Sequence, residues 1–203
     1  MNKLTETNLP AIGTTMPGGF FAGAILVNGQ RRAVILSTKK IGISLKGAWH
    51  EEEIDVPGAK SYNDGLANTQ AMAEAGSGLA KTVLALEIDG LNDFYIPSQD
   101  ELELCYRAFK PTTEQNWCYV RSGINLSALP QTYPYTPNFP VQTLLEAFKV
   151  GGEEAFENDW YWSSTQHAGY SDDAWYQHFD SGDQDDGDKS AELRVRAVRS
   201  QPI

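Results

Sequence analysis

The carboxyl-terminal quarter of the sequence constrains the fold most, because it sets a strongly acidic segment between short alternating segments. Residues 180–191, DSGDQDDGDKSA, contain no hydrophobic side chain larger than alanine. WYWSST and AWYQHF precede this segment and LRVRAVR follows it, and each alternates with the period of two that is typical of a β-strand. Ordered elements on both sides exclude a disordered acidic tail and predict an acidic loop between strands.

The alternation in AWYQHF divides its side chains between two faces of the expected strand. One face carries Trp175 and Gln177 and is interpreted as scaffold, whereas the other carries Tyr176 and His178. Aromatic and polar side chains together are typical of binding surfaces, but an ordinary solvated strand face has the same pattern. We expect Tyr176 and His178 to be exposed. The residues expected inside are Trp160, Trp162, Trp175 and Phe179.

The first third of the chain predicts a sheet followed by helices. Asn28 and Gly29 stand between two apolar runs and predict a hairpin, since both residues accept a positive φ. Residues 61–86 are rich in alanine and leucine with helical periodicity, interrupted at Gly76 and Gly78. This pattern favours either one long helix with a weak middle or two short helices.

The middle of the chain predicts a well-delimited helix and then a long loop. Ser98 and Glu101 form a capping box, and Pro111 ends the helix. Residues 112–140 are rich in Pro, Asn, Thr and Tyr and predict a long ordered loop, which a short helix over 141–148 follows. The residues expected on the apolar face of the capped helix are Leu102, Cys105, Tyr106 and Phe109.

The order of sheet, helices, loop and sheet predicts one α+β domain over residues 1–203, with a β-rich amino-terminal part over residues 1–60. A net charge of −11 and a pI near 4.6 argue against binding to nucleic acid. No apolar run approaches a membrane span and the amino terminus lacks a signal peptide, so we expect a soluble chain made in the cytoplasm. Two cysteines, Cys105 and Cys118, favour buried free thiols over a disulfide.

Neither a metal site nor a catalytic site stands out in the sequence. The aspartates of residues 180–191 do not have the spacing of an EF-hand, because Gly182 and Gly187 fall at the wrong offsets. The three histidines lie in different segments, and no serine or cysteine near them has a nucleophile signature. We therefore expect no metal, no cofactor and no enzymatic activity.

Aspartate is used without glutamate in residues 167–191. This window holds seven Asp and no Glu, whereas the rest of the chain holds six Asp and fourteen Glu. Loops prefer aspartate because it bonds to the local backbone, so part of the bias is expected from structure alone. Only four residues in the window fall outside the set Ala, Asp, Gly, Ser, Tyr, His and Phe, namely Trp175, Gln177, Gln184 and Lys189.

YWSSTQ, AWYQHF and LRVRAVR, preceded by FYIPSQDELELCYR and GGEEAF, resemble the variable proteins of diversity-generating retroelements. The resemblance covers about residues 93–199, and MPGGFFAG and SYNDGLANTQAMAEAGS are similar to the amino-terminal part of phage-associated relatives. It implies a C-type lectin fold of the formylglycine-generating-enzyme type, with a mixed antiparallel sheet, two main helices and long ordered loops.

The resemblance also explains the composition of the window. In that family an error-prone reverse transcriptase randomises adenines, and asparagine codons then become codons that cannot encode Glu, Gln, Lys, Met or Trp. The resemblance implies a diversified ligand-binding region over residues 166–192 in which the four exceptions are fixed. The candidate diversified residues are His167, Gly169, Tyr170, Ser171, Asp172, Asp173, Tyr176, His178, Asp180, Ser181, Asp183, Asp185, Asp186, Gly187, Asp188, Ser190 and Ala191.

Two departures from related branches limit the function that the resemblance implies. The enzymatic branch of the fold uses a cysteine pair near the carboxyl-terminal end of the domain, and no cysteine follows Cys118 here. The sugar-binding motifs Glu-Pro-Asn, Gln-Pro-Asp and Trp-Asn-Asp are also missing. The leading hypothesis is a non-enzymatic protein that displays a hypervariable surface on a virion or cell and binds a cell-surface protein or glycan, with self-association into a homo-oligomer also open. The alternatives are a bacterial lectin-like adhesin without diversification and an enzyme of the formylglycine-generating type.

Overall fold

The computed structural model describes residues 8–42 and 45–203. Residues 1–7, part of the amino terminus for which no signal peptide is expected, lie outside the described residues. The described strands form two five-stranded sheets. The first sheet has the order β1-β2-β3-β10, with β5 paired to β2, and its strands are β1 (Thr15–Met16), β2 (Gly19–Val27), β3 (Gln30–Ser37), β5 (Ala128–Leu129) and β10 (Val198–Pro202). The second has the order β4-β9-β6-β7-β8, and its strands are β4 (Lys46–Ala48), β6 (Trp160–Gln166), β7 (Asp173–His178), β8 (Gln184–Asp188) and β9 (Glu192–Arg194).

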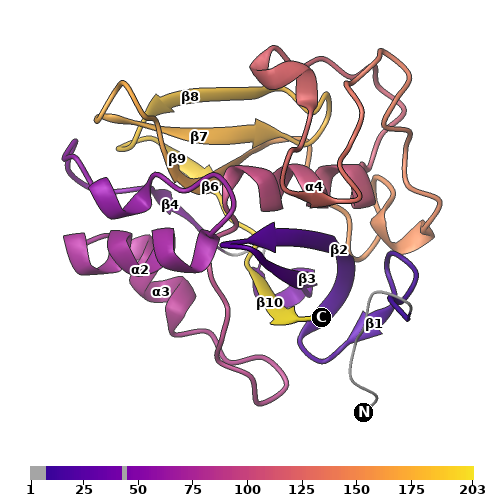
Figure 1. Cartoon of the computed structure of the whole chain (residues 1–203), viewed down its shortest axis with the longest axis horizontal. Coiled ribbons are helices and arrows are strands. Elements are labelled where there is room, and N and C mark those ends of the chain that lie inside the picture. Colours follow the sequence, from indigo (N-terminus) through magenta and orange to yellow (C-terminus); the bar gives the residue numbers. More distant parts are fainter. Residues whose placement is uncertain (1–7, 43–44) are drawn as a thin grey trace.

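Helices lie between and beside the two sheets. Figure 1 shows α4 between the sheets, where it contacts β2 on one side and β6 and β7 on the other. α2 and α3 lie on the left of the molecule in Figure 1, where α2 packs against β6 and α3 packs against β4. The α-helices are α1 (Lys39–Gly42), α2 (Gly65–Ala75), α3 (Gly78–Leu84) and α4 (Gln99–Phe109). Three 3-10 turns, at Pro57–Ala59, Val120–Gly123 and Glu146–Phe148, complete a mixed α+β arrangement with mainly antiparallel sheets.

The local signals of the first half produce the elements that they predict. Asn28 and Gly29 have φ angles of 48° and 78° and join β2 to β3 in the predicted hairpin. The periodic segment forms two short helices, because Gly76, with φ 124°, ends α2 and the side chain of Ser77 caps α3.

The helix predicted from the capping box is α4, and both hydrogen bonds of the box are present. Its predicted apolar face, made of Leu102, Cys105, Tyr106 and Phe109, is buried between the sheets. Cys105 and Cys118 are free thiols, the first buried and the second half-buried. The preference for free thiols over a disulfide is thus confirmed.

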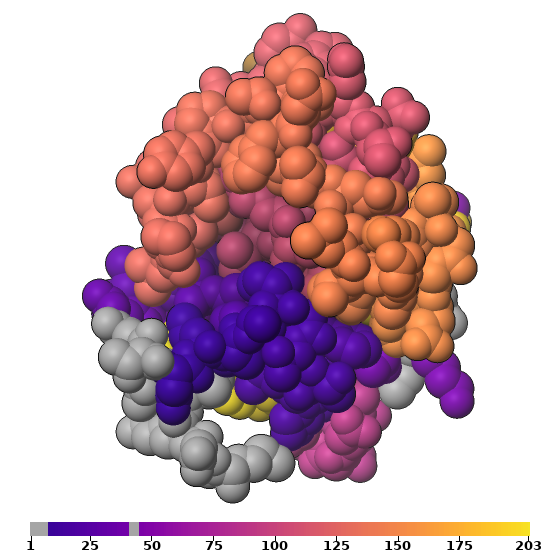
Figure 2. All heavy atoms as spheres, turned by 90° about the vertical axis from the view of Figure 1, so that its right-hand side faces the viewer, coloured from indigo at the N-terminus to yellow at the C-terminus, as the bar shows by residue number. Residues whose placement is uncertain are grey.

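The short helix predicted over residues 141–148 is wrong. Only Glu146–Phe148 forms a 3-10 turn. The preceding residues form no helix and bond to the chain after α4 instead: the Thr143 N–H donates to the Lys110 carbonyl and the Gln142 side chain to the Pro111 carbonyl. Val141 and Leu144, which a helix would have turned inward, are 60% and 88% exposed. The segment therefore continues the long ordered loop predicted before it, which covers much of the face shown in Figure 2.

Two further predictions need correction. LRVRAVR does not form one strand but divides between β9 and β10, which belong to different sheets. The buried Arg196 lies at the crossing, where its guanidinium donates to the Ser37 and Glu154 carbonyls. The acidic segment is also more ordered than a loop, since its residues 184–188 form β8 and pair with β7 throughout. Pairing to a neighbouring strand outweighs the poor strand propensity of aspartate and glycine.

Candidate ligand-binding surface

Strand pairing brings the aromatic face of β7 together with parts of β6 and β8. Tyr176 lies opposite Trp162 on one side and Asp185 on the other, and His178 lies opposite Trp160. The ring centroids of Trp160 lie 4.7 Å from those of Tyr176 and His178, and Trp162 lies 5.4 Å from Tyr176. This packing corrects two expectations. Tyr176 and His178, expected to be exposed, and Trp160, expected to be buried, are all half-buried, because each ring covers part of its neighbour.

The opposite face of β7 is buried, as the alternation predicts. Trp175 is 8% exposed and Phe179 is fully buried, with its ring stacked at 3.7 Å on Phe156. Gln177 donates through Nε2 to the Gly182 carbonyl at 3.1 Å, inside the protein. The predicted burial of Trp162, Trp175 and Phe179 is therefore confirmed.

Lys189 is a buried cation inside the acidic segment. Its Nζ donates to the Ile54 carbonyl at 2.7 Å, to Gln166 Oε1 at 2.6 Å and to the Ser171 carbonyl. The same atom lies 4.6 Å above the ring of Trp49, in position for a cation–π contact. Lys189 therefore links the end of β8 to the turn before β7 through Ser171 and to residues 54–56 through Ile54 and Gln166, whose Oε1 also accepts the Val56 N–H.

The loop between β6 and β7 presents an ordered aromatic tip. The rings of His167 and Tyr170 stack at 4.8 Å, and His167 Nδ1 accepts the N–H groups of Gly169 and Tyr170 at 3.2 and 2.9 Å. The ring centroids of His167 and Trp175 lie 5.0 Å apart. Tyr170 is 61% exposed, so a large side chain is held outward on a fixed base.

Exposure separates the candidate diversified residues from the four exceptions in the same window. Each of the seventeen candidates is exposed or half-buried, and each exception is at most 8% exposed. The exposed candidates are Gly169, Tyr170, Ser171, Asp172, Asp185, Asp188, Ser190 and Ala191. The half-buried candidates are His167, Asp173, Tyr176, His178, Asp180, Ser181, Asp183, Asp186 and Gly187. The buried exceptions are Trp175, Gln177, Gln184 and Lys189.

The surface is electrostatically negative and uncompensated. Burial, reinforced by neighbouring carboxylates, raises the pKa values of Asp173 and Asp183. The same two causes raise the pKa of Tyr176 to about 12. Lys189 is the only Lys or Arg of residues 166–192, and it is buried. A positively charged group on a partner would therefore gain from contact with this surface.

The carboxylates do not converge on a common point. Within residues 8–42 and 45–203, no three His, Cys, Asp or Glu side chains are grouped so that they could hold a metal ion. Asp188 instead accepts hydrogen bonds from Ser190, which hold its pKa below the usual range. Asp185 likewise accepts the N–H of the next residue, Asp186, as aspartates in turns commonly do.

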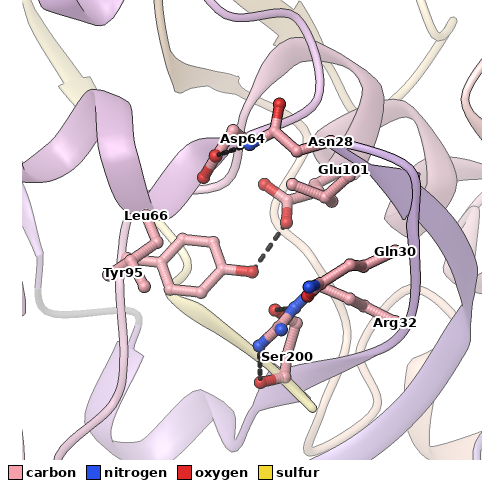
Figure 3. A pocket seen from close by; sticks show the side chains of 9 residues that line it. Asn28, Gln30, Arg32, Asp64, Leu66, Tyr95, Glu101 and Ser200 are labelled. Carbon is pink, nitrogen blue, oxygen red and sulfur yellow. Dashed lines mark hydrogen bonds between the residues drawn. The ribbon is translucent and has the colours of Figure 1, made fainter. Parts of the chain in front are cut away.

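Away from this surface, a cavity of about 270 Å³ lies between the β2–β3 hairpin, α2, α4 and β10 (Figure 3). Nothing in the sequence indicated this cavity. Its polar groups bond to one another: Tyr95 donates to Glu101 Oε1 at 2.6 Å, and Arg32 Nε donates to Ser200 Oγ at 2.8 Å. None of the seventeen candidate residues lines this cavity. We interpret it as part of the scaffold, since both of its carboxylates already accept hydrogen bonds: Glu101 from the capping box and the Gly65 N–H, and Asp64 from the Asn28 side chain and the Ala67 N–H.

Comparison with known proteins assigns the family. The model of the Lcl C-terminal domain matches residues 46–199, which include β4 and β6 to β9. The chain belongs to the Lcl C-terminal domain family. This is a family of variable proteins of diversity-generating retroelements with a C-type lectin fold, which supports the resemblance seen in the sequence. No curated protein matches the chain. In the part of this Lcl C-terminal domain protein that the structure describes, no helix is long and apolar enough to cross a membrane.

Proposed function

We propose that this chain is a non-enzymatic variable protein of a diversity-generating retroelement, and that it binds its ligand through the surface of β7, β8 and the loop before β7. One observation carries the proposal: the seventeen candidate residues are all exposed or half-buried, and the four residues of the window that randomised asparagine codons cannot encode are all buried, together with Ala174, Phe179 and Gly182. Hydrophobicity accounts for the burial of Trp175, but Gln177, Gln184 and Lys189 are polar residues that an ordinary acidic loop would expose.

The geometry explains how such a surface could vary without unfolding the protein. The folding information of β7 and β8 lies in the buried side chains, and backbone pairing between the two strands does not depend on side-chain identity. A C-type lectin fold with two sheets and long loops would then serve as a fixed frame. The half-buried Tyr176 and His178 mark the positions where variation is most restricted by packing.

The proposed ligand is a protein or glycan on a cell surface, met by a virion or by a displaying cell. Tyr, His, Ser, Gly and Asp provide rigid contact area and adaptable hydrogen bonds, as in antibody paratopes. The acidic charge of the surface argues against polyanionic ligands such as nucleic acid. A lectin-like adhesin without diversification is the second candidate, because the family match and the fold would be the same in both cases.

The coding DNA separates these two candidates. Under the proposal, the gene is followed by a near-copy of its last hundred or so bases that differs only where the copy has adenine, and by a reverse transcriptase gene. An isolated gene without such a copy would contradict diversification and favour the adhesin.

Binding through this surface is tested with residues whose replacement should not disturb folding. Tyr170, Asp172 and Asp185 are exposed, so replacing all three with Ser should leave stability within about 1 kcal/mol. The triple variant should lose binding to any partner isolated with the parent from host surface material. A matched control replaces Tyr133 and Glu146, both exposed on the long loop, with Ser and should bind like the parent. Equal binding by the two variants would place the site elsewhere.

A further inference from the structure

The long loop contains an uncharged stretch in an otherwise strongly acidic chain. Residues 122–145, SGINLSALPQTYPYTPNFPVQTLL, include no Asp, Glu, Lys or Arg, although such residues make up 21% of the chain. Large hydrophobic side chains of this stretch are nevertheless exposed, Tyr133 at 78% and Phe139 at 45%. Exposed aromatic residues without charged neighbours in sequence are typical of a protein–protein interface. The other exposed hydrophobic side chains of the stretch are Leu126, Val141 and Leu144.

An apolar groove of about 320 Å³ opens beside the uncharged stretch. Figure 2 shows a hollow at this place, between the long loop and the indigo amino-terminal segment, with α4 beneath. Leu104 and Ala108 line the groove from α4, Ile12 lines it from the amino-terminal segment, and Tyr133 and Phe139 line it from the loop. The groove therefore joins three parts of the chain at the surface.

Arg107 is the only charged residue that lines the groove in the described part of the chain, and its charge is compensated within the protein. Its Nε donates to Glu103 Oε1 at 2.5 Å, and its Nη2 donates to the carbonyls of Gly123 and Tyr133 at 2.6 and 2.8 Å. The guanidinium also lies 4.7 Å from the centre of the Tyr135 ring. An uncharged occupant therefore fits the groove better than an anion does.

The walls of the groove are fixed before any partner arrives. β5 pairs with β2 on one side, and Thr136 and Phe139 exchange two backbone hydrogen bonds of 2.8 and 3.0 Å on the other. The buried Asn116 holds the end of the stretch, since its Nδ2 donates to the Pro140 carbonyl at 2.8 Å. The entropy of ordering the loop is thus lost on folding and not on binding.

The size of the groove and its surroundings favour an aromatic side chain of a protein. An apolar cavity of about 150 Å³ binds benzene, so this larger groove accepts a ring system of about the size of indole. The rings of Tyr133 and Phe139 allow edge-to-face contacts with such a group. Pro140, Val141 and Leu144, which follow Phe139 in the chain, line a second hollow of about 440 Å³. A small molecule in the groove would leave that hollow uncovered, whereas a protein segment covers both.

We propose that the uncharged stretch and its groove are the docking surface for a protein partner that inserts an uncharged side chain of tryptophan size. The net charge of −11 disfavours a second copy of this chain as the occupant, because like net charges keep proteins apart. None of the seventeen candidate diversified residues lies in the stretch or lines the groove. The proposal rests on the proposed function in one respect: if residues 167–191 vary, this surface is the constant one, and its partner holds the chain while the variable surface meets its ligand.

The test titrates the full, isotope-labelled chain with the neutral peptide acetyl-Ser-Trp-Leu-Ser-amide and follows the backbone amide signals by NMR. We expect saturable shifts at Gly23, Ala108 and Thr132, which line the groove, and no saturable shifts with acetyl-Ser-Ala-Leu-Ser-amide, which lacks the ring. Free indole should bind at least about threefold more weakly than the tryptophan peptide, because indole does not cover the second hollow. Phe139→Ala removes a wall and Ala108→Leu fills the groove, so each should weaken the peptide about fivefold or more.

Two control variants show whether the effect belongs to this groove. Tyr119→Ala removes an exposed aromatic ring of the same loop that does not line the groove, and it should change the affinity less than about twofold. The Tyr170, Asp172 and Asp185 triple Ser variant should bind the peptide like the parent, which separates failure of this docking surface from failure of the proposed ligand surface. Amide signals outside the groove report whether each variant is folded, and Ala108→Leu decides the test if Phe139→Ala does not fold.

Several outcomes would overturn the proposal. They are no saturable binding, equal loss in Phe139→Ala and Tyr119→Ala, and indole binding as tightly as the peptide, which would assign the groove to a small molecule. A dimer of the parent in analytical ultracentrifugation that Phe139→Ala abolishes would assign the surface to a second copy. Co-sedimentation of the parent, but not of Phe139→Ala, with phosphatidylcholine vesicles would assign it to lipid.

Discussion

Replacing Lys189 with Met should destabilise the protein strongly, although Lys189 stands among aspartates in the most polar segment of the chain. The substitution keeps the length of the side chain and removes the donor from the buried side-chain oxygen of Gln166 and from the part-buried carbonyls of Ile54 and Ser171. Each unsatisfied buried acceptor costs about 1–3 kcal/mol. Part of the loss is offset, because the folded protein no longer removes a charge from water, a cost visible in burial lowering the pKa of Lys189 to about 8.

We therefore expect Lys189→Met to lower the free energy of unfolding by about 2–4 kcal/mol, measured by urea denaturation at pH 7. In a domain of this size that loss corresponds to a fall in Tm of roughly 5–15 °C. The neighbouring exposed residue provides the control, since Ala191→Ser should change stability by less than about 0.5 kcal/mol. A loss below about 0.5 kcal/mol for Lys189→Met would refute the reasoning that this lysine anchors the surface.

Three further outcomes follow from the same structure. Trp175→Ala should cost about 3–5 kcal/mol in chemical denaturation, as expected for a buried aromatic residue, and a loss under about 1 kcal/mol would mean that the two faces of β7 are assigned the wrong way round. Millimolar calcium or a chelator should move Tm by no more than about 2 °C, whereas a rise of about 5 °C would reveal a cation site. The raised pKa values of Asp173 and Asp183 mean that the folded state binds more protons than the unfolded state just above pH 4, so stability falls as pH rises through that window. The Asp173→Asn, Asp183→Asn double variant should therefore gain stability relative to the parent between pH 4 and pH 7 in urea denaturation, and a pH-independent difference would contradict the assignment.

Short-range signals predicted the elements that depend on a few neighbouring residues. Asn28 and Gly29 fix the hairpin through their φ angles, and Ser98 and Glu101 fix the start of α4 through hydrogen bonds within one turn. The burial of Trp175 also followed from local alternation. In each case the deciding interaction lies close along the chain, so the sequence pattern alone contains the information.

The predictions that proved wrong concern features that depend on residues distant in sequence. The strand β8 forms in an aspartate-rich segment because β7 supplies the pairing, and LRVRAVR divides because Arg196 bonds to residues far away in the chain. The half-burial of Tyr176 comes from Trp160 and Trp162 on a different strand.

The central claim, that residues 167–191 combine a fixed buried frame with a freely variable surface, is tested most directly by a saturation scan of folding across this window. Each position is replaced by every residue that randomised asparagine codons encode, and folded variants are recovered by protease resistance on a display platform. We predict broad tolerance at the exposed candidates, narrower tolerance at the half-buried ones such as Tyr176, and rejection at Trp175, Gln177, Gln184 and Lys189. Equal tolerance at these four positions, or rejection at Tyr170, Asp172 and Asp185, would contradict the account.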